Sequence, residues 1–77
     1  MVVQIGETYR NLWARFDVRV VPRPHGLNHY AVEVRSPGAS EWQVCGWTPT
    51  LREAARLMEQ FLSARADPST PFCPVPL

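Results

Sequence analysis

The sequence predicts an α+β fold in which a three- to four-stranded antiparallel sheet, arranged as a meander, packs on one C-terminal α-helix. In the first half of the chain apolar and polar side chains alternate in short runs, which is typical of strands with one buried face. After residue 47 the apolar period changes to that of an amphipathic helix. Four of the eight prolines lie in the last eleven residues. We therefore expect one domain over residues 1–66 and an extended, proline-rich tail over residues 67–77.

Two strands are predicted from alternation alone. The clearest covers residues 13–21, where Phe16, Val18 and Val20 alternate with other side chains. Residues 29–36 repeat the pattern, and a short connection favours antiparallel pairing of the two.

The segments around these strands are predicted from turn residues. Residues 22–28 are expected to form a loop, because two prolines there lack the backbone N–H that a sheet requires. The Ser-Pro-Gly sequence at 36–38 predicts a turn, and residues 41–47 the next strand. Large apolar groups on both faces of that strand are typical of a central strand covered on two sides. For residues 1–12 we favour a further strand, with a short helix as the alternative.

Residues 48–65 are predicted to form the helix. Thr50 followed by Glu53 has capping-box spacing, in which the hydroxyl accepts from a free backbone amide of the first turn. The apolar stripe expected to face the sheet consists of Leu51, Ala54, Ala55, Leu57, Met58, Phe61 and Leu62.

Composition narrows the classes of function. The formal net charge is only +1, with arginine as the basic residue throughout, so no strong general field attracts a polyanion or an acidic membrane. No stretch approaches the roughly 18 apolar residues that cross a bilayer, and the N-terminus lacks a signal-peptide pattern. We expect a cytoplasmic protein without a membrane partner, with Cys45 and Cys73 as free thiols.

Residues that could carry chemistry are few. Cys45 lies between Trp42 and Trp47 in a predicted strand, and we interpret it as a packing residue rather than a nucleophile. His25 and His29 lie on a predicted loop, away from any CxxC pair, so no metal site is expected. The sequence shows no carboxylate pair, nucleophile elbow or phosphate-binding glycine loop. We therefore expect neither catalysis nor a cofactor.

Tryptophan, tyrosine and arginine most often dominate protein–protein interfaces, and this chain has three tryptophans and carries aromatic and arginine residues near the predicted loop ends. The predicted function is accordingly a small protein-binding module. Its predicted contacts are Trp13, Arg15, Arg23, His25, Trp47 and Phe72. For the tryptophans the alternative is core packing. Phe72 and its apolar neighbours in the tail either dock on the domain or enter another protein's groove. An uncovered sheet edge can pair with a second copy of the chain, so a homodimer is a further alternative.

The alternative function is nucleic-acid binding by an arginine and aromatic face of the sheet. Its predicted residues are Arg10, Arg15, Arg19, Arg23, Arg35 and Tyr30. Against this function, Asp17 shares a strand face with Arg19, and Glu33 shares one with Arg35. This arrangement is typical of paired charges on a solvated surface.

Two resemblances bear on these alternatives. Over residues 13–65 the predicted order of three strands and a helix resembles the DNA-binding arms of phage integrases and, more loosely, double-stranded-RNA-binding domains. The lysine-rich helix start of the RNA-binding family is replaced here by Thr50, Leu51 and Arg52. In size and lone-domain character the chain also resembles small inhibitors carried by phages and mobile elements, such as anti-CRISPR proteins. That resemblance rests on no motif and implies a host nuclease or CRISPR–Cas complex as partner.

Overall fold

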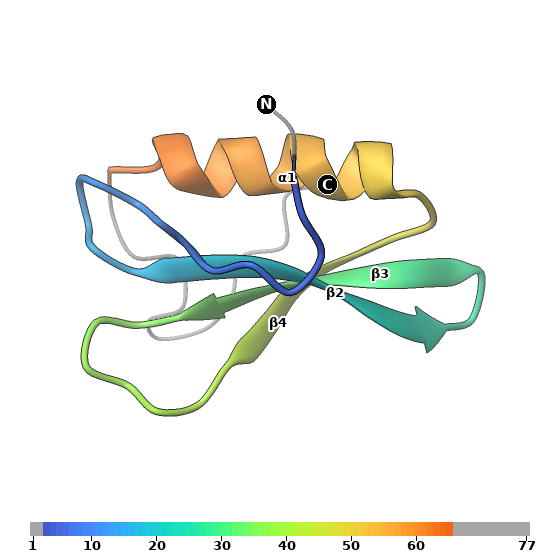
Figure 1. Cartoon of the computed structure of the whole chain (residues 1–77), viewed down its shortest axis with the longest axis horizontal. Helices are drawn as coiled ribbons and strands as arrows, with labels where there is room; N and C mark the ends of the chain where they lie inside the picture. The colour runs from blue at the N-terminus through green and yellow to red at the C-terminus, as the bar shows by residue number, and fades with distance from the viewer. Residues whose placement is uncertain (1–2, 66–77) are drawn as a thin grey trace.

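The fold is a four-stranded antiparallel sheet with one helix across one of its faces, as a computed structural model of residues 3–65 shows (Figure 1). The strands lie in chain order, β1-β2-β3-β4. They are β1 (Tyr9–Arg10), β2 (Asp17–His25), β3 (Asn28–Arg35) and β4 (Gln43–Thr48), followed by α1 (Leu51–Ser63). This confirms the predicted α+β meander. The predicted tail lies outside the described residues.

The core lies between α1 and the sheet face that it covers. Val18 and Val20 of β2 and Val32 and Val34 of β3 are fully buried there, as the alternation predicted. From the helix, Ala54, Met58 and Phe61 close the core, with other members of the predicted stripe packed around them. Most of the apolar side chains that drive folding therefore lie on one side of the sheet.

The hairpin of β2 and β3 corrects the predicted loop at residues 22–28. Strand β2 continues through Pro22, which pairs with Tyr30. The carbonyl of Val20 accepts a hydrogen bond from Gly6 N at 2.8 Å, on the side of β2 away from β3. Alternate residues direct their backbone groups to the same edge, so the N–H that Pro22 lacks would also face away from β3. Proline is tolerated here because the β2–β3 ladder loses no donor.

The N-terminal part of the domain holds a shorter strand than expected. Among residues 3–16, only Tyr9–Arg10 form a strand paired with β2, through the partners Tyr9 and Val18 and the partners Arg10 and Asp17. The predicted strand start at Trp13 is wrong, because residues 12–14 form a turn and β2 begins at Asp17. The expected further strand in residues 1–12 is present, but it covers two residues.

Strand β4 is an edge strand, which corrects its expected central position. Its pairing with β3 shifts by one residue, because Val32 pairs with Gly46 while Glu33 pairs with Val44. Cys45 is therefore the extra residue of a β-bulge. Before this strand, the predicted turn is confirmed: Ala39 N donates to Ser36 O at 3.0 Å, and Gly38 has a φ of 78°.

The helix begins as predicted. The Thr50 hydroxyl accepts from Glu53 N at 3.2 Å, and Glu53 places a negative charge in the first turn, where the helix dipole favours it. The helix passes so close to β4 that a Cβ at Gly46 would lie 2.2 Å from Leu57 Cδ2. The Leu57 side chain therefore occupies the space that a side chain at position 46 would need.

We expect the effect of Gly46→Ala on the free energy of unfolding to have opposite signs in the native and the Leu57→Ala backgrounds. In the native background the added methyl displaces Leu57 and lowers the free energy of unfolding by about 1 kcal/mol. In a Leu57→Ala background the space is open, so the same change should raise stability by roughly 0.4–1 kcal/mol through the unfolded chain. Urea unfolding of the four proteins of this double-mutant cycle measures both values. Equal effects in the two backgrounds would contradict the close packing.

Candidate binding site

The sheet face that turns away from α1 carries four of the chain's eight arginines. We call this surface the outer face. It is formed by Arg10, Asp17, Arg19, Arg23, His25, Glu33, Arg35, Trp42 and Trp47. The alternation that buries the valines under the helix places the charged residues of β2 and β3 on this opposite side.

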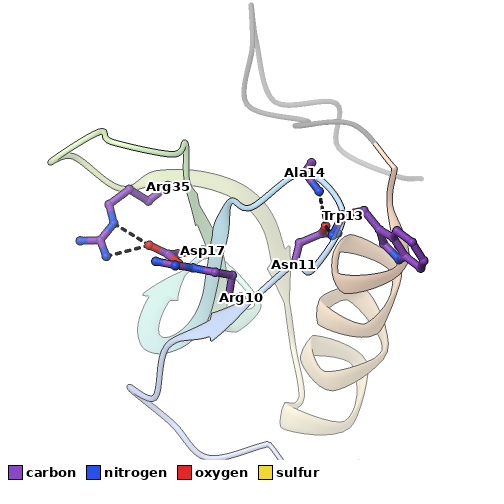
Figure 2. A network of polar contacts seen from close by, with 6 residues as sticks. All are labelled: Arg10, Asn11, Trp13, Ala14, Asp17 and Arg35. Carbon is purple, nitrogen blue, oxygen red and sulfur yellow. Dashed lines mark hydrogen bonds and ion pairs between the residues drawn. The ribbon is translucent and has the colours of Figure 1, made fainter.

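Asp17 joins three strands through its carboxylate (Figure 2). Oδ2 accepts from Arg35 Nη2 at 2.8 Å and from its Nε at 3.2 Å, while Oδ1 accepts from Arg10 Nε at 3.1 Å. Burial by itself raises the pKa of Asp17. Hydrogen bonds and charge from Arg35 and Arg10 outweigh burial and hold the pKa below its ordinary value of 3.8.

Glu33 has the same role one step along the hairpin. Its Oε1 accepts from Arg19 Nε at 2.6 Å, directly across the β2–β3 pair. Its Oε2 lies 3.3 Å from Arg23 Nη1. Each carboxylate therefore holds two guanidinium groups. For Asp17 both come from residues paired with it on the neighbouring strands, whereas for Glu33 one comes from its partner Arg19 and the other from Arg23, further along β2.

The arginines cover the carboxylates rather than the reverse. The side chains of Asp17 and Glu33 are only 9% and 3% exposed, whereas those of Arg10 and Arg23 are 58% and 52% exposed. Arg19 and Arg35 are intermediate, at 30% and 31%. Four guanidinium groups against two carboxylates leave an excess of two positive charges on the outer face. A partner approaching this face meets N–H donors first.

Tryptophan rings complete the outer face. The guanidinium groups of Arg19 and Arg35 lie 4.1 and 4.5 Å from the centroid of Trp42, within the range of cation–π attraction. Trp47 stacks on His25 with ring centroids 4.4 Å apart. The Trp42 ring and the two carboxylates together fix the orientation of Arg19 and Arg35.

A second surface lies at the Leu12–Arg15 turn, beside the end of α1. Asn11, which is fully buried, holds this turn (Figure 2). Its Oδ1 accepts from Trp13 N at 2.8 Å and from Ala14 N at 2.7 Å. The two hydrogens of its Nδ2 are shared among three carbonyls at the end of the helix: Phe61 O at 2.8 Å, Leu62 O at 3.0 Å and Ala64 O at 2.7 Å.

The Leu12–Arg15 turn presents large apolar groups to solvent. Leu12 is 78% exposed and Trp13 is 59% exposed. Arg65 lies over the Trp13 ring, with its guanidinium carbon 3.8 Å from the centroid. Arg15 adopts a φ of 69°, a left-handed conformation that is unfavourable for a residue with a Cβ.

The structure separates the residues predicted for protein binding into two groups. Trp13 and Arg15 belong to the turn, whereas Arg23, His25 and Trp47 lie on the outer face. Phe72 lies outside the described residues.

The residues predicted for nucleic-acid binding gather more closely. Four of the five predicted arginines share the outer face, and Arg15 does not. Tyr30 packs against the core on the side of α1. Trp42 was not among the predicted site residues, because its ring reaches over the sheet from just before β4. Asn11 was not among them either, although asparagine is a common turn residue.

Cys45 is fully buried, which confirms its interpretation as a packing residue. It is disulfide-bonded, so the expected free thiol is wrong at this position. The other cysteine of the chain, Cys73, lies outside the described residues. Within residues 3–65 no group of three histidine, cysteine or carboxylate side chains is placed to hold a metal ion. No helix in that part of the chain is long and apolar enough to cross a membrane.

Comparison with family models, with curated proteins and with solved structures finds no match to this chain. The geometry of the two surfaces is therefore the basis for assigning a function.

We expect Asn11→Ala to lower the free energy of unfolding by about 2–4 kcal/mol. The change leaves buried carbonyls and amides without partners at both the turn and the helix end. Chemical denaturation monitored by circular dichroism measures the loss. Asn28→Ala, at the start of β3, provides the matched control. A loss at Asn11 no larger than at Asn28 would show that the turn is held by other contacts.

The lowered pKa of Asp17 predicts how its contribution to stability depends on pH. A carboxyl whose folded pKa is below its unfolded value stabilises the fold above the unfolded pKa, and this stabilisation is lost as pH falls through the folded pKa. The stability difference between the native protein and Asp17→Asn should therefore be constant from about pH 5 to 7 and shrink below about pH 4. Thermal unfolding across this range tests it, with the exposed Glu41→Gln as control. A difference that grows on acidification would contradict the assignment.

Proposed function

We propose that this protein is a non-enzymatic binding module that attaches to another protein through the Leu12–Arg15 turn. The observation that carries the proposal is the exposure of Leu12 and Trp13, two large apolar side chains adjacent in sequence, on a turn held by a buried side chain. Tryptophan and arginine are among the residue types most enriched in interface hot spots.

The turn is already ordered before any partner binds. Asn11 ties it to the last carbonyls of α1, and Arg15 N donates to Asn11 O at 2.9 Å. Binding through an ordered turn loses less conformational entropy than binding through a flexible loop. The unfavourable backbone of Arg15 supports the proposal, because local strain of this kind is concentrated at functional sites.

The chemistry of the turn suggests the kind of partner. Leu12 and Trp13 fit an apolar pocket, while Arg15 and Arg65 at its margin fit an acidic rim. A host nuclease or CRISPR–Cas complex, blocked by occupation of its surface, is the specific form of partner that the small size of the chain suggests. This form of the proposal places the protein in the cytoplasm, where cysteines are kept reduced. Determining whether Cys45 is a thiol or a disulfide in the native cell tests that location.

We expect Trp13→Ala to weaken binding of the partner at least about 30-fold, the effect of removing a hot-spot side chain. Thermal stability should change little, because the contact with Arg65 is exposed and contributes only about 0.5–1 kcal/mol. The measurement is quantitative co-purification from the native host with native, Trp13→Ala and Leu27→Ala proteins.

Leu27 provides the matched control. It is 90% exposed at the tip of the β2–β3 hairpin, so its truncation removes exposed apolar surface of a similar kind at a different place. A partner lost equally from the Leu27 and Trp13 variants, or retained by both, would refute the turn as the contact.

A further inference from the structure

We infer that the outer face binds the phosphodiester backbone of a duplex nucleic acid. The inference rests on four guanidinium groups that lie together over two buried carboxylates. It concerns a different surface from the Leu12–Arg15 turn and does not depend on the function proposed for that turn.

The first step is the distribution of charge. The chain as a whole has a net charge of +1, but the outer face has an excess of two positive charges and exposes guanidinium rather than carboxylate. Each guanidinium has five N–H donors, and its contacts to Asp17 or Glu33 use only one or two of its nitrogens. The remaining donors of Arg10 and Arg23, which are the most exposed, can contact phosphate oxygens.

Second, the arginine side chains of the outer face are already held in place in the free protein. A long side chain loses about 0.5–1.5 kcal/mol of conformational freedom when it is immobilised on binding. Here Asp17 and Glu33 hold their arginines from beneath, and Trp42 lies against two of them. The donors are therefore positioned in the free protein, and much of that loss is already incurred on folding.

The third step is the choice of ligand. A duplex carries one charge about every 1.7 Å along its axis and releases condensed counterions when its phosphates are neutralised. An acidic protein surface lacks this condensed layer, so a face with an excess of only two charges gains less from it. The aromatic rings favour a duplex over a single strand. The Trp42 ring is already in contact with guanidinium groups and the Trp47 ring with His25, so less ring surface is open for the stacking of unstacked bases.

The test uses the full chain and fluorescence anisotropy with a labelled 20-base-pair DNA duplex, in salt from about 50 to 200 mM. We expect a Kd in the micromolar range at the lowest salt and a slope of log K against log salt of roughly −2 to −4. Arg23→Ala should weaken binding several-fold and reduce the slope by about 1. The fold is expected to survive, because Arg19 still pairs with Glu33. The Arg10→Ala, Arg23→Ala double variant should reduce the slope further.

The control variant is Arg52→Ala, Arg56→Ala. These exposed arginines lie on the helix, so the pair changes the net charge of the chain as much as the double variant does but leaves the outer face intact. It should retain the slope of the native protein, and so should Trp13→Ala.

Equal losses in the helix and outer-face variants would overturn the proposal, as would absence of binding at 50 mM salt. Titrations with one strand of the same DNA and with polyglutamate test the choice of ligand. Equal affinity for polyglutamate, or tighter binding of the single strand, would overturn the assignment of a duplex. A parallel titration with duplex RNA distinguishes the two sources of phosphodiester.

Discussion

One helix can cover only one face of a four-stranded sheet, and the rest of this structure depends on how the other face is stabilised. A second apolar layer is absent from the described part of the chain. Instead, Asp17 and Glu33 are buried under arginines that span β1, β2 and β3. Buried carboxylates are unfavourable unless they are paired and hydrogen-bonded, and here each accepts contacts at both oxygens. The same pairs that make the outer face stable leave it cationic.

Asn11 solves a different problem, at the end of the helix. The last carbonyls of a helix have no partners within it and require donors from elsewhere. The Nδ2 of Asn11 supplies them from a segment fifty residues earlier in the chain, and its Oδ1 orders the turn that follows. A single buried amide therefore fixes the position of α1 against the sheet and the conformation of the Leu12–Arg15 turn. Exposure of Trp13 on an ordered backbone follows from this arrangement.

The sequence was sufficient for features that depend on local periodicity. The alternation around Val18 and Val32 predicted the central residues of both strands and their buried faces correctly, although not both ends of β2, and Thr50 marked the helix start. The sequence was insufficient where the conformation depends on contacts with residues distant in the chain. Pro22 predicted a loop because proline lacks a donor, but β2 has β3 as its partner on one side and the Pro22 nitrogen faces the other.

The same limit applies to the candidate sites. Pairing of Asp17 and Glu33 with arginines was foreseen from strand alternation, but their depth was not. Alternation gives the face on which a side chain lies, not which of two charged groups covers the other. Trp42 reaches the outer face from outside a strand, and Asn11 contacts a helix fifty residues away. No local pattern carries either fact.

The two surfaces meet in one short segment. Arg10 and Asn11 are consecutive, and because neighbouring side chains of an extended chain point to opposite sides, Arg10 reaches the outer face while Asn11 reaches the helix. The guanidinium groups and the exposed tryptophan thus lie on different sides of the domain, as the close view of this region shows (Figure 2). A protein partner bound at the turn, as proposed, would leave the outer face open to a nucleic acid. Together the two proposals describe a module suited to a complex that itself contains both protein and nucleic acid, because each of its surfaces matches one component.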